Sequence, residues 1–131
     1  VLPFEGFPKL DKNKNPTWKT GQLNDASYDD VKHFISDDNV ILIKGIFPDT
    51  IKEIPRNTQF SFIHLDTDLY EGTLAGCEYF YDKINPGGAI LVDDYGFLSC
   101  PGVKSAIDYF FQNKLEVPIY LPSGQCLVIK N

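Results

Sequence analysis

The sequence has few of the features that build disulfide frameworks or membrane spans. Its three cysteines, Cys77, Cys100 and Cys126, are odd in number and include no CxxC pair, which predicts reduced thiols in a cytoplasmic protein. No apolar run approaches the roughly 20 residues that cross a bilayer, and the first residues lack the basic start of a signal peptide. We therefore expect no membrane partner.

Basic residues are also in deficit, with 12 Lys and Arg against 18 Asp and Glu and a net charge of −6. This charge has the wrong sign for a phosphate backbone, so we expect no nucleic-acid partner. The 131 residues, 43% of them hydrophobic, predict a single domain over residues 1–131 that buries a core without disulfides or zinc. The chain contains no Met and begins at Val1, which leaves a truncated domain as an open alternative.

Hydrophobic patterning predicts an α/β fold with a mostly parallel sheet. Residues 5–24 are rich in Pro, Gly, Asn and Lys and predict a mobile surface loop, with cover for a substrate as the alternative. Ser27 followed by Asp30 predicts a helix that begins with a capping box and ends near Ser36. In chain order, the other expected elements are strands over 40–43, 60–65 and 89–92, helices over 72–83 and 101–113, and a closing hairpin of strands 117–121 and 126–129.

Four carboxylates follow two of these strands. Asp66 and Asp68 come just after the strand over 60–65, and Asp93 and Asp94 come just after the next one. Ligands of open α/β sheets bind beyond the carboxyl ends of the strands. Since neighbouring strands lie about 4.8 Å apart, acids at both tips can share a hard divalent cation. The alternative is that one acid caps a helix while the others are solvated.

The two histidines do not look like metal ligands. His64 lies inside the strand over 60–65 and is expected in the core or on a sheet face, and His33 is expected to be exposed on the short helix. We find no convincing histidine ligand or nucleophile beside the acids, which makes a metal-dependent hydrolase the weaker interpretation.

Five segments, in their order and spacing, resemble the macrocin O-methyltransferase family. These segments are Phe4-Glu5-Gly6-Phe7-Pro8, Lys44-Gly45-Ile46-Phe47-Pro48-Asp49-Thr50, His64-Leu65-Asp66-Thr67-Asp68-Leu69-Tyr70-Glu71, Pro86-Gly87-Gly88 and Val92-Asp93-Asp94-Tyr95. Members of this family are class I, S-adenosylmethionine-dependent enzymes that methylate sugar hydroxyls of natural products. The resemblance implies a Rossmann-like methyltransferase sheet, of which this chain is the C-terminal portion with a terminal antiparallel hairpin.

The resemblance also implies site residues. Asp66, Asp93 and Asp94 correspond to the magnesium ligands of the family. Magnesium lowers the pKa of a bound hydroxyl and positions its oxygen against the methyl group. We nominate Asp66 as the base that takes the proton, with Asp68 as the alternative.

Gly45 and Ile46 follow the strand that borders the adenine of the cofactor in this fold. They are therefore candidates for cofactor contact, and an ordinary strand-ending turn is the competing interpretation. The cofactors implied are S-adenosylmethionine and Mg²⁺, and the implied partner is a small molecule that carries a hydroxyl group.

Two features depart from the family pattern. The glycine-rich loop and first strand expected upstream of Phe4 are missing, and Leu2 stands where an acid usually holds the ribose. This loss should leave a gap in mid-sheet that the chain must close, cover or fill from a partner copy. Two hypotheses follow: a magnesium-assisted O-methyltransferase, and a truncated, non-catalytic domain that self-associates into a homo-oligomer.

Overall fold

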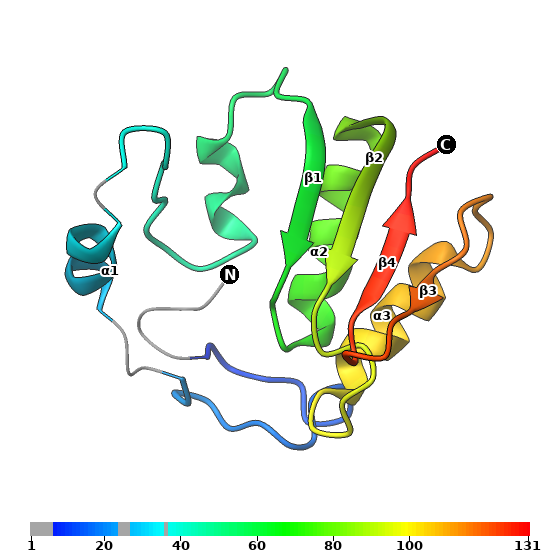
Figure 1. Ribbon diagram of the computed structural model, residues 1–131. Helices are drawn as coiled ribbons and strands as arrows, with labels where there is room; N and C mark the ends of the chain where they lie inside the picture. The colour runs from blue at the N-terminus through cyan, green and yellow to red at the C-terminus, as the bar shows by residue number, and fades with distance from the viewer. Residues whose placement is uncertain (1–6, 24–26, 36) are drawn as a thin grey trace.

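The computed structural model describes residues 7–23, 27–35 and 37–131. It contains a four-stranded sheet in the order β1-β2-β4-β3 (Figure 1). The strands are β1 (Phe60–Leu65), β2 (Ile84–Val92), β3 (Ile119–Tyr120) and β4 (Cys126–Ile129). β1 and β2 are parallel, whereas β4 is antiparallel to both β2 and β3. The predicted α/β class, the parallel pair and the closing antiparallel hairpin are confirmed.

Two helices cover one face of this sheet (Figure 1). They are α2 (Tyr70–Phe80), which continues into a 3-10 turn (Tyr81–Lys83), and α3 (Pro101–Phe111). The alternation along β1 explains the arrangement, since Ile63 and Leu65 point into the core while Phe62 and His64 are exposed. α3 buries the apolar stripe predicted for it, including Val103 and Ile107. β2 begins earlier than predicted, because Ile84 already pairs with Phe60 before a register irregularity.

The predicted strand over residues 40–43 is wrong. This segment is irregular, and Val40 and Ile41 are 45% and 86% exposed. In the part of the chain that the structure describes, β1 ends the sheet on this side and no strand pairs with 40–43. A β-branched run forms a strand only where a neighbour accepts its hydrogen bonds. A 3-10 helix, Asp49–Glu53, follows this segment.

The predicted short helix is present as α1 (Tyr28–Phe34). The Ser27 hydroxyl oxygen accepts a hydrogen bond from the Asp30 backbone N–H at 3.1 Å, as the capping pattern predicts. The predicted end at Ser36 lies outside the described residues. His33 on this helix is exposed, as expected. Within the described ranges, no helix has both the length and the apolar character needed to cross a membrane.

The loop predicted before α1 is irregular and mostly exposed over residues 8–23, and buried side chains attach it to the core. Phe7 is 3% exposed, and its ring packs edge-on against Trp18 with 5.3 Å between the centroids. Asn15 is 2% exposed; its amide donates to the Glu71 carboxylate at 2.8 Å, and its carbonyl oxygen accepts from the Tyr70 N–H at 2.9 Å. Asn15 therefore caps the start of α2 from a distant part of the chain.

Candidate functional site

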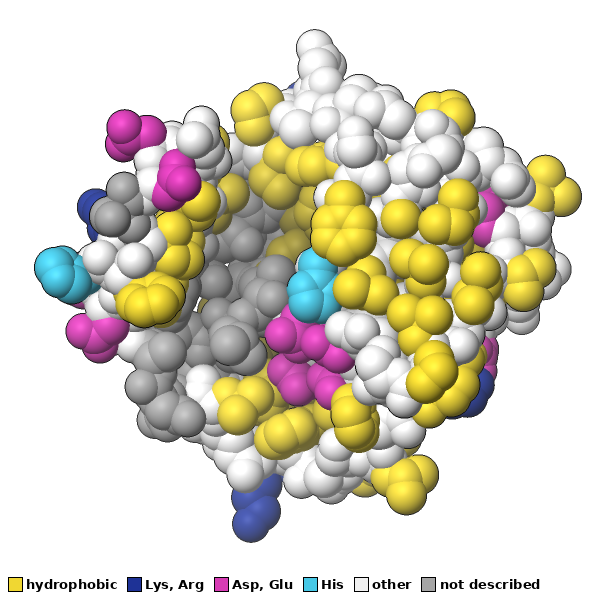
Figure 2. Space-filling view, in the orientation of Figure 1, with side chains coloured by type: hydrophobic (Ala, Val, Ile, Leu, Met, Phe, Trp, Pro, Cys, Tyr) yellow, Lys and Arg dark blue, Asp and Glu magenta, His cyan; other side chains and the backbone are white. Residues whose placement is uncertain are grey.

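β1 and β2 end side by side, and acidic residues follow both strands directly. Leu65 and Val92 are the last paired residues, and the Asp93 N–H donates to the Leu65 carbonyl at 2.8 Å. Asp66 and Asp93 therefore leave the tips of two neighbouring parallel strands. Figure 2 shows acidic side chains gathered here, next to a histidine and at the rim of a hollow in this face of the molecule.

Asp68, Asp94 and Cys100 form the tightest group of ligand atoms at this edge. One ligand atom from each lies within 4.8 Å of the other two, and the Cys100 thiol lies 3.9 Å from Asp68 Oδ1. Asp68 is 9% exposed, and its Oδ2 is buried with no hydrogen-bond partner in the described part of the chain. Cys100 is the N-cap residue of α3, so α3 brings a sulfur ligand to the two carboxylates.

The carboxylates of this group are crowded and partly removed from water. Burial, followed by the negative charges of Asp94 and Asp66, raises the pKa of Asp68 to about 7. Burial also raises the pKa of Asp94 and that of the Cys100 thiol. Burial is the larger cause in each case, and a divalent cation between these groups would offset the negative charge that adds to it. The donor set therefore fits a cation.

The two turns that follow the strands rest on unusual backbone conformations. Asp68 and Asp94 have φ values of +55° and +59°, in the left-handed region that aspartate tolerates better than most residues. After Asp68 the chain reverses tightly, since the Leu69 N–H donates to the Thr67 carbonyl at 2.6 Å. Strained residues of this kind persist where the surroundings hold them, and they cluster at functional sites.

Hydrogen bonds attach the acidic loop after β1 to helix α2. The hydroxyl groups of Thr67 and Thr73 lie 2.7 Å apart, and the Thr73 hydroxyl donates to the Leu69 carbonyl at 2.8 Å. Gly72 allows the close approach, because a Cβ at this position would lie 3.0 Å from the Cβ of Thr67. These contacts fix the backbone on both sides of Asp68.

The predicted metal ligands are not all oriented alike. Asp66 acts electrostatically on both Asp68 and Asp94, so the structure brings these three acids together. Asp93 also adds negative charge beside Asp94, and it makes two further contacts: Oδ2 lies 3.5 Å from His64 Nε2, and Oδ1 accepts from the Asp94 N–H at 3.1 Å. His64 lies on the exposed sheet face, one of the two places expected for it.

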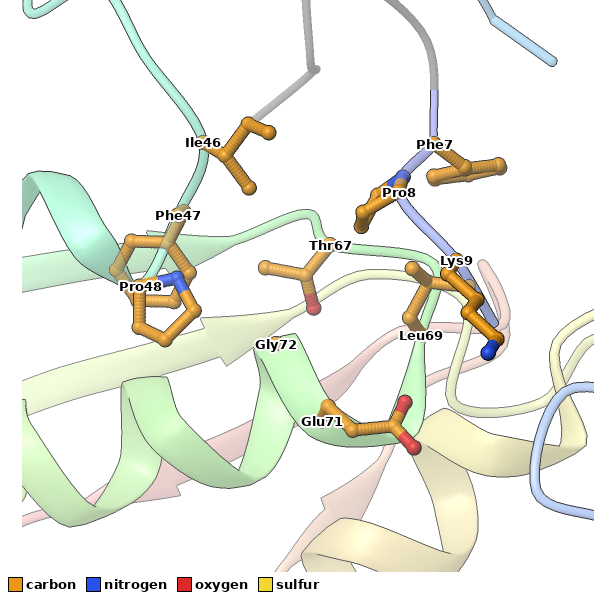
Figure 3. A pocket seen from close by; sticks show the side chains of 10 residues that line it. All are labelled: Phe7, Pro8, Lys9, Ile46, Phe47, Pro48, Thr67, Leu69, Glu71 and Gly72. Carbon is orange, nitrogen blue, oxygen red and sulfur yellow. The ribbon is translucent and has the colours of Figure 1, made fainter. Parts of the chain in front are cut away.

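An apolar pocket of about 160 Å³ adjoins the acidic loop (Figure 3). Residues 7–9 and 46–48 form its walls, together with Thr67 and the start of α2. Ile46, one of the two predicted cofactor residues, points into this space. Gly45 does not line this pocket; together with Ile46 it lines a separate, more open depression of about 580 Å³. Gly45 also has a φ of +142°, and a Cβ there would lie 2.6 Å from the Thr50 side chain, so the turn itself requires glycine.

The sequence interpretation missed the thiol beside the acids and the side chain that anchors the first loop. Cys100 was predicted only as a reduced thiol, and its contact with Asp68 bridges 32 positions of sequence. Asn15 lies 55 positions from the helix that it caps. Neither position belongs to a local motif, so no local signal in the sequence could have found them.

Solved methyltransferase structures share this fold. The O-methyltransferase NovP superposes with a TM-score of 0.83 and 23% sequence identity, over 98% of this chain and 57% of its own. The calicheamicin methyltransferase CalS11 superposes with a TM-score of 0.73 and 20% identity, over 97% of this chain and 57% of its own. The sheet and its helices are therefore those of a class I methyltransferase-like fold.

The model of the macrocin-O-methyltransferase (TylF) family matches residues 4–126, so the chain belongs to this family, and the resemblance is confirmed. The demethyldecarbamoylnovobiocin O-methyltransferase of Streptomyces niveus is 36% identical over 74 residues, which cover 56% of this chain and 27% of the relative. The 8-demethyl-8-(2,3-dimethoxy-alpha-L-rhamnosyl)-tetracenomycin-C 4'-O-methyltransferase of Streptomyces olivaceus is 35% identical over 110 residues, which cover 74% of this chain and 41% of the relative. The chain thus spans less than half the length of these relatives.

Proposed function

We propose that this protein takes part in magnesium-assisted methyl transfer from S-adenosylmethionine to a hydroxyl group of a small, sugar-containing natural product. The observation that carries the proposal is the gathering of Asp66, Asp68 and Asp94 beyond the carboxyl ends of β1 and β2. Family membership supports the methyl-transfer chemistry, and the names of the curated relatives support a small-molecule acceptor. The three free cysteines are buried, which supports a reducing, cytoplasmic setting.

Asp66, Asp93 and Asp94 are the residues proposed to hold magnesium. Carboxylate oxygens are the ligands that a hard cation prefers, and these side chains follow directly from two adjacent strand tips. Bound magnesium would lower the pKa of the acceptor hydroxyl. We nominate Asp66 as the base that takes its proton and Asp68 as the alternative, since an acid with a pKa of about 7 is also suited to this role.

Gly45 and Ile46 are the residues proposed to contact the cofactor. Ile46 contributes an apolar wall to the pocket beside the acidic loop (Figure 3), and such a wall suits the flat face of an adenine ring. Lys9 and Glu71 add polar groups at its rim. A pocket on this side of the acidic loop would place the methyl donor near the residues proposed to hold the acceptor.

Calorimetric titration with Mg²⁺ and with S-adenosylmethionine tests the two parts of this proposal. We expect Mg²⁺ binding that weakens about 10- to 100-fold in Asp93→Ala and is unchanged in Asp82→Ala. Asp82 is exposed just before β2 begins, at the opposite end of that strand. Unchanged magnesium affinity in Asp93→Ala would contradict the ligand assignment. Absence of binding heat with S-adenosylmethionine would contradict the cofactor assignment.

A further inference from the structure

Two buried polar atoms have no hydrogen-bond partner in the described ranges, and both flank the same thiol. They are Asp68 Oδ2 and the indole N–H of Trp18. The other carboxylate oxygen of Asp68 lies 3.9 Å from Cys100 Sγ. The Trp18 side chain lowers the pKa of the Cys100 thiol, although burial raises it more. Buried polar atoms without partners are rare in folded proteins. The unpartnered oxygen of Asp68 therefore belongs to the same group of ligand atoms as Asp94 and Cys100.

We propose that Asp68, Asp94 and Cys100 form a binding site for a borderline divalent cation such as Zn²⁺, with Cys100 as a thiolate ligand. Zinc takes sulfur at about 2.3 Å and carboxylate oxygen at about 2.0–2.2 Å, so two such ligand atoms around one tetrahedral ion lie roughly 3.6 Å apart. The distance between Cys100 Sγ and Asp68 Oδ1 is 3.9 Å, and the three ligand atoms lie within 4.8 Å of one another. Only small side-chain movements are needed to close the site.

Cation binding would satisfy both unpartnered atoms at once. The Cys100 thiol loses its proton to solvent when the sulfur coordinates the cation. The thiolate then accepts a hydrogen bond from the Trp18 indole, and Asp68 Oδ2 becomes available as a ligand. Two carboxylates and one thiolate leave one negative charge on the complex with a divalent ion. Asp94 is only half-buried, so its side offers the cation a route to the buried Asp68 and Cys100.

This site differs from the proposed magnesium site in its ligands. The magnesium ligands Asp66, Asp93 and Asp94 offer oxygen atoms alone, whereas Cys100 adds a soft sulfur that favours Zn²⁺ or Co²⁺ over Mg²⁺. Asp94 belongs to both sets, so the two kinds of cation should compete. The inference concerns cation binding and does not depend on methyl transfer.

Cobalt is a suitable probe, because a thiolate bound to Co²⁺ gives a charge-transfer absorption in the near ultraviolet. We expect the full chain, reduced and titrated with Co²⁺, to develop this band to saturation at one ion per chain, and Zn²⁺ to abolish it. Cys100→Ala should lose the band and bind Co²⁺ about 10- to 100-fold more weakly. The matched control is Cys77→Ala, which removes another buried thiol and should retain the band.

Three results would overturn the inference: no Co²⁺ binding, Co²⁺ binding without the thiolate band, or an undiminished band in Cys100→Ala. Circular dichroism establishes whether each variant folds. If Cys100→Ala does not fold, Asp68→Asn decides, since it keeps the side-chain shape and should weaken Co²⁺ binding by a similar factor. Co²⁺ binding that is not weakened in Asp68→Asn would contradict the inference.

The same variants separate this inference from the proposed function. Asp93→Ala should weaken Mg²⁺ binding while the cobalt band persists. Cys100→Ala should lose the cobalt band while Mg²⁺ binding persists. If the thiolate site is absent but the magnesium proposal holds, the chain should bind Mg²⁺ normally and show no thiolate band. If the magnesium ligand assignment is wrong but the thiolate site is present, the cobalt band should be normal and Asp93→Ala should not change the Mg²⁺ affinity.

Discussion

The first part of the described chain, residues 7–59, leaves most of its apolar side chains outside the core, whereas the second part, residues 60–131, forms the core. Every member of the buried core cluster lies between Ile63 and Val128. Of the described residues from 7 to 59, only Phe7 and Asn15 are buried. Residues 40–43, which include Ile41, are more uniformly apolar than residues 60–65, which include Ile63. Even so, Ile41 is 86% exposed and Ile63 is 8% exposed. Burial therefore depends on the neighbours that a segment finds rather than on its own composition.

β1 shows which neighbours are needed. β2 pairs with one edge of β1, and α2 and α3 cover one face of the sheet (Figure 1). The segment over 40–43 has no strand beside it within the described part of the chain. Residues 7–59 instead attach to the core through single side chains such as Asn15 and Trp18. The following substitutions test this contrast, from the largest expected effect to the smallest.

Matched isoleucine truncations should separate the two parts most clearly. Ile107 on α3 is 0% exposed, so Ile107→Ala removes buried methylene groups and leaves a cavity. We expect a loss of about 2–5 kcal/mol in the free energy of unfolding. Ile41→Ala should change it by less than about 0.5 kcal/mol. Denaturant titration followed by circular dichroism gives both values, and equal losses would refute the contrast.

Asn15→Ala should destabilise the attachment of the first part to the second. The substitution leaves the Tyr70 N–H without its acceptor and the Glu71 carboxylate without its donor. We expect a loss of about 1–3 kcal/mol and faster tryptic cleavage at Lys12 and Lys19. Asn13→Ala is the control, since Asn13 is exposed. Asn15 would have no anchoring role if both variants were cleaved at the same rate.

Acid should reduce the stability of the fold by protonating Glu116, which lies in the second part of the chain. This residue is 5% exposed, and hydrogen bonds from the Tyr81 hydroxyl and then from Lys130 lower its pKa to about 2. A lowered pKa in the folded state adds stability above pH 5, and this contribution disappears as the pH falls from about 5 to 2. Tyr81→Phe should cost about 1 kcal/mol at neutral pH.

Unfolding free energies measured from pH 7 to pH 2 check this prediction. Tyr81→Phe should lose less stability than the unmodified chain between pH 5 and pH 2, because part of the Glu116 contribution is already absent. Tyr109 is 57% exposed, so Tyr109→Phe should follow the unmodified chain. A pH dependence that is unaffected by Tyr81→Phe would show that this hydrogen bond does not set the pKa of Glu116.

Local patterns predicted the elements that find their partners nearby. The capping box of α1, the apolar stripe of α3 and the closing hairpin each depend on residues a few positions apart. The strand predicted over 40–43 failed because strand formation depends on a neighbouring chain segment that local sequence does not reveal.

The candidate site, too, was predictable only where it depends on residues that lie close together in the sequence. The sequence indicated the acids after β1 and β2 because each pair follows its strand directly. It did not indicate which side chains turn towards one another. Asp93 turns to His64, whereas Cys100 comes to Asp68 from the start of α3. Such contacts arise from the packing of distant elements, and no spacing rule in the sequence encodes them.

Binding of Mn²⁺, followed by electron paramagnetic resonance of the free ion, tests most directly whether the tips of β1 and β2 hold a divalent cation. Mn²⁺ accepts the carboxylate ligands that suit Mg²⁺. The account predicts one Mn²⁺ per chain, with affinity about 10- to 100-fold lower in Asp94→Asn and unchanged in Asp82→Asn. Equal affinity in Asp94→Asn and the unmodified chain would contradict it.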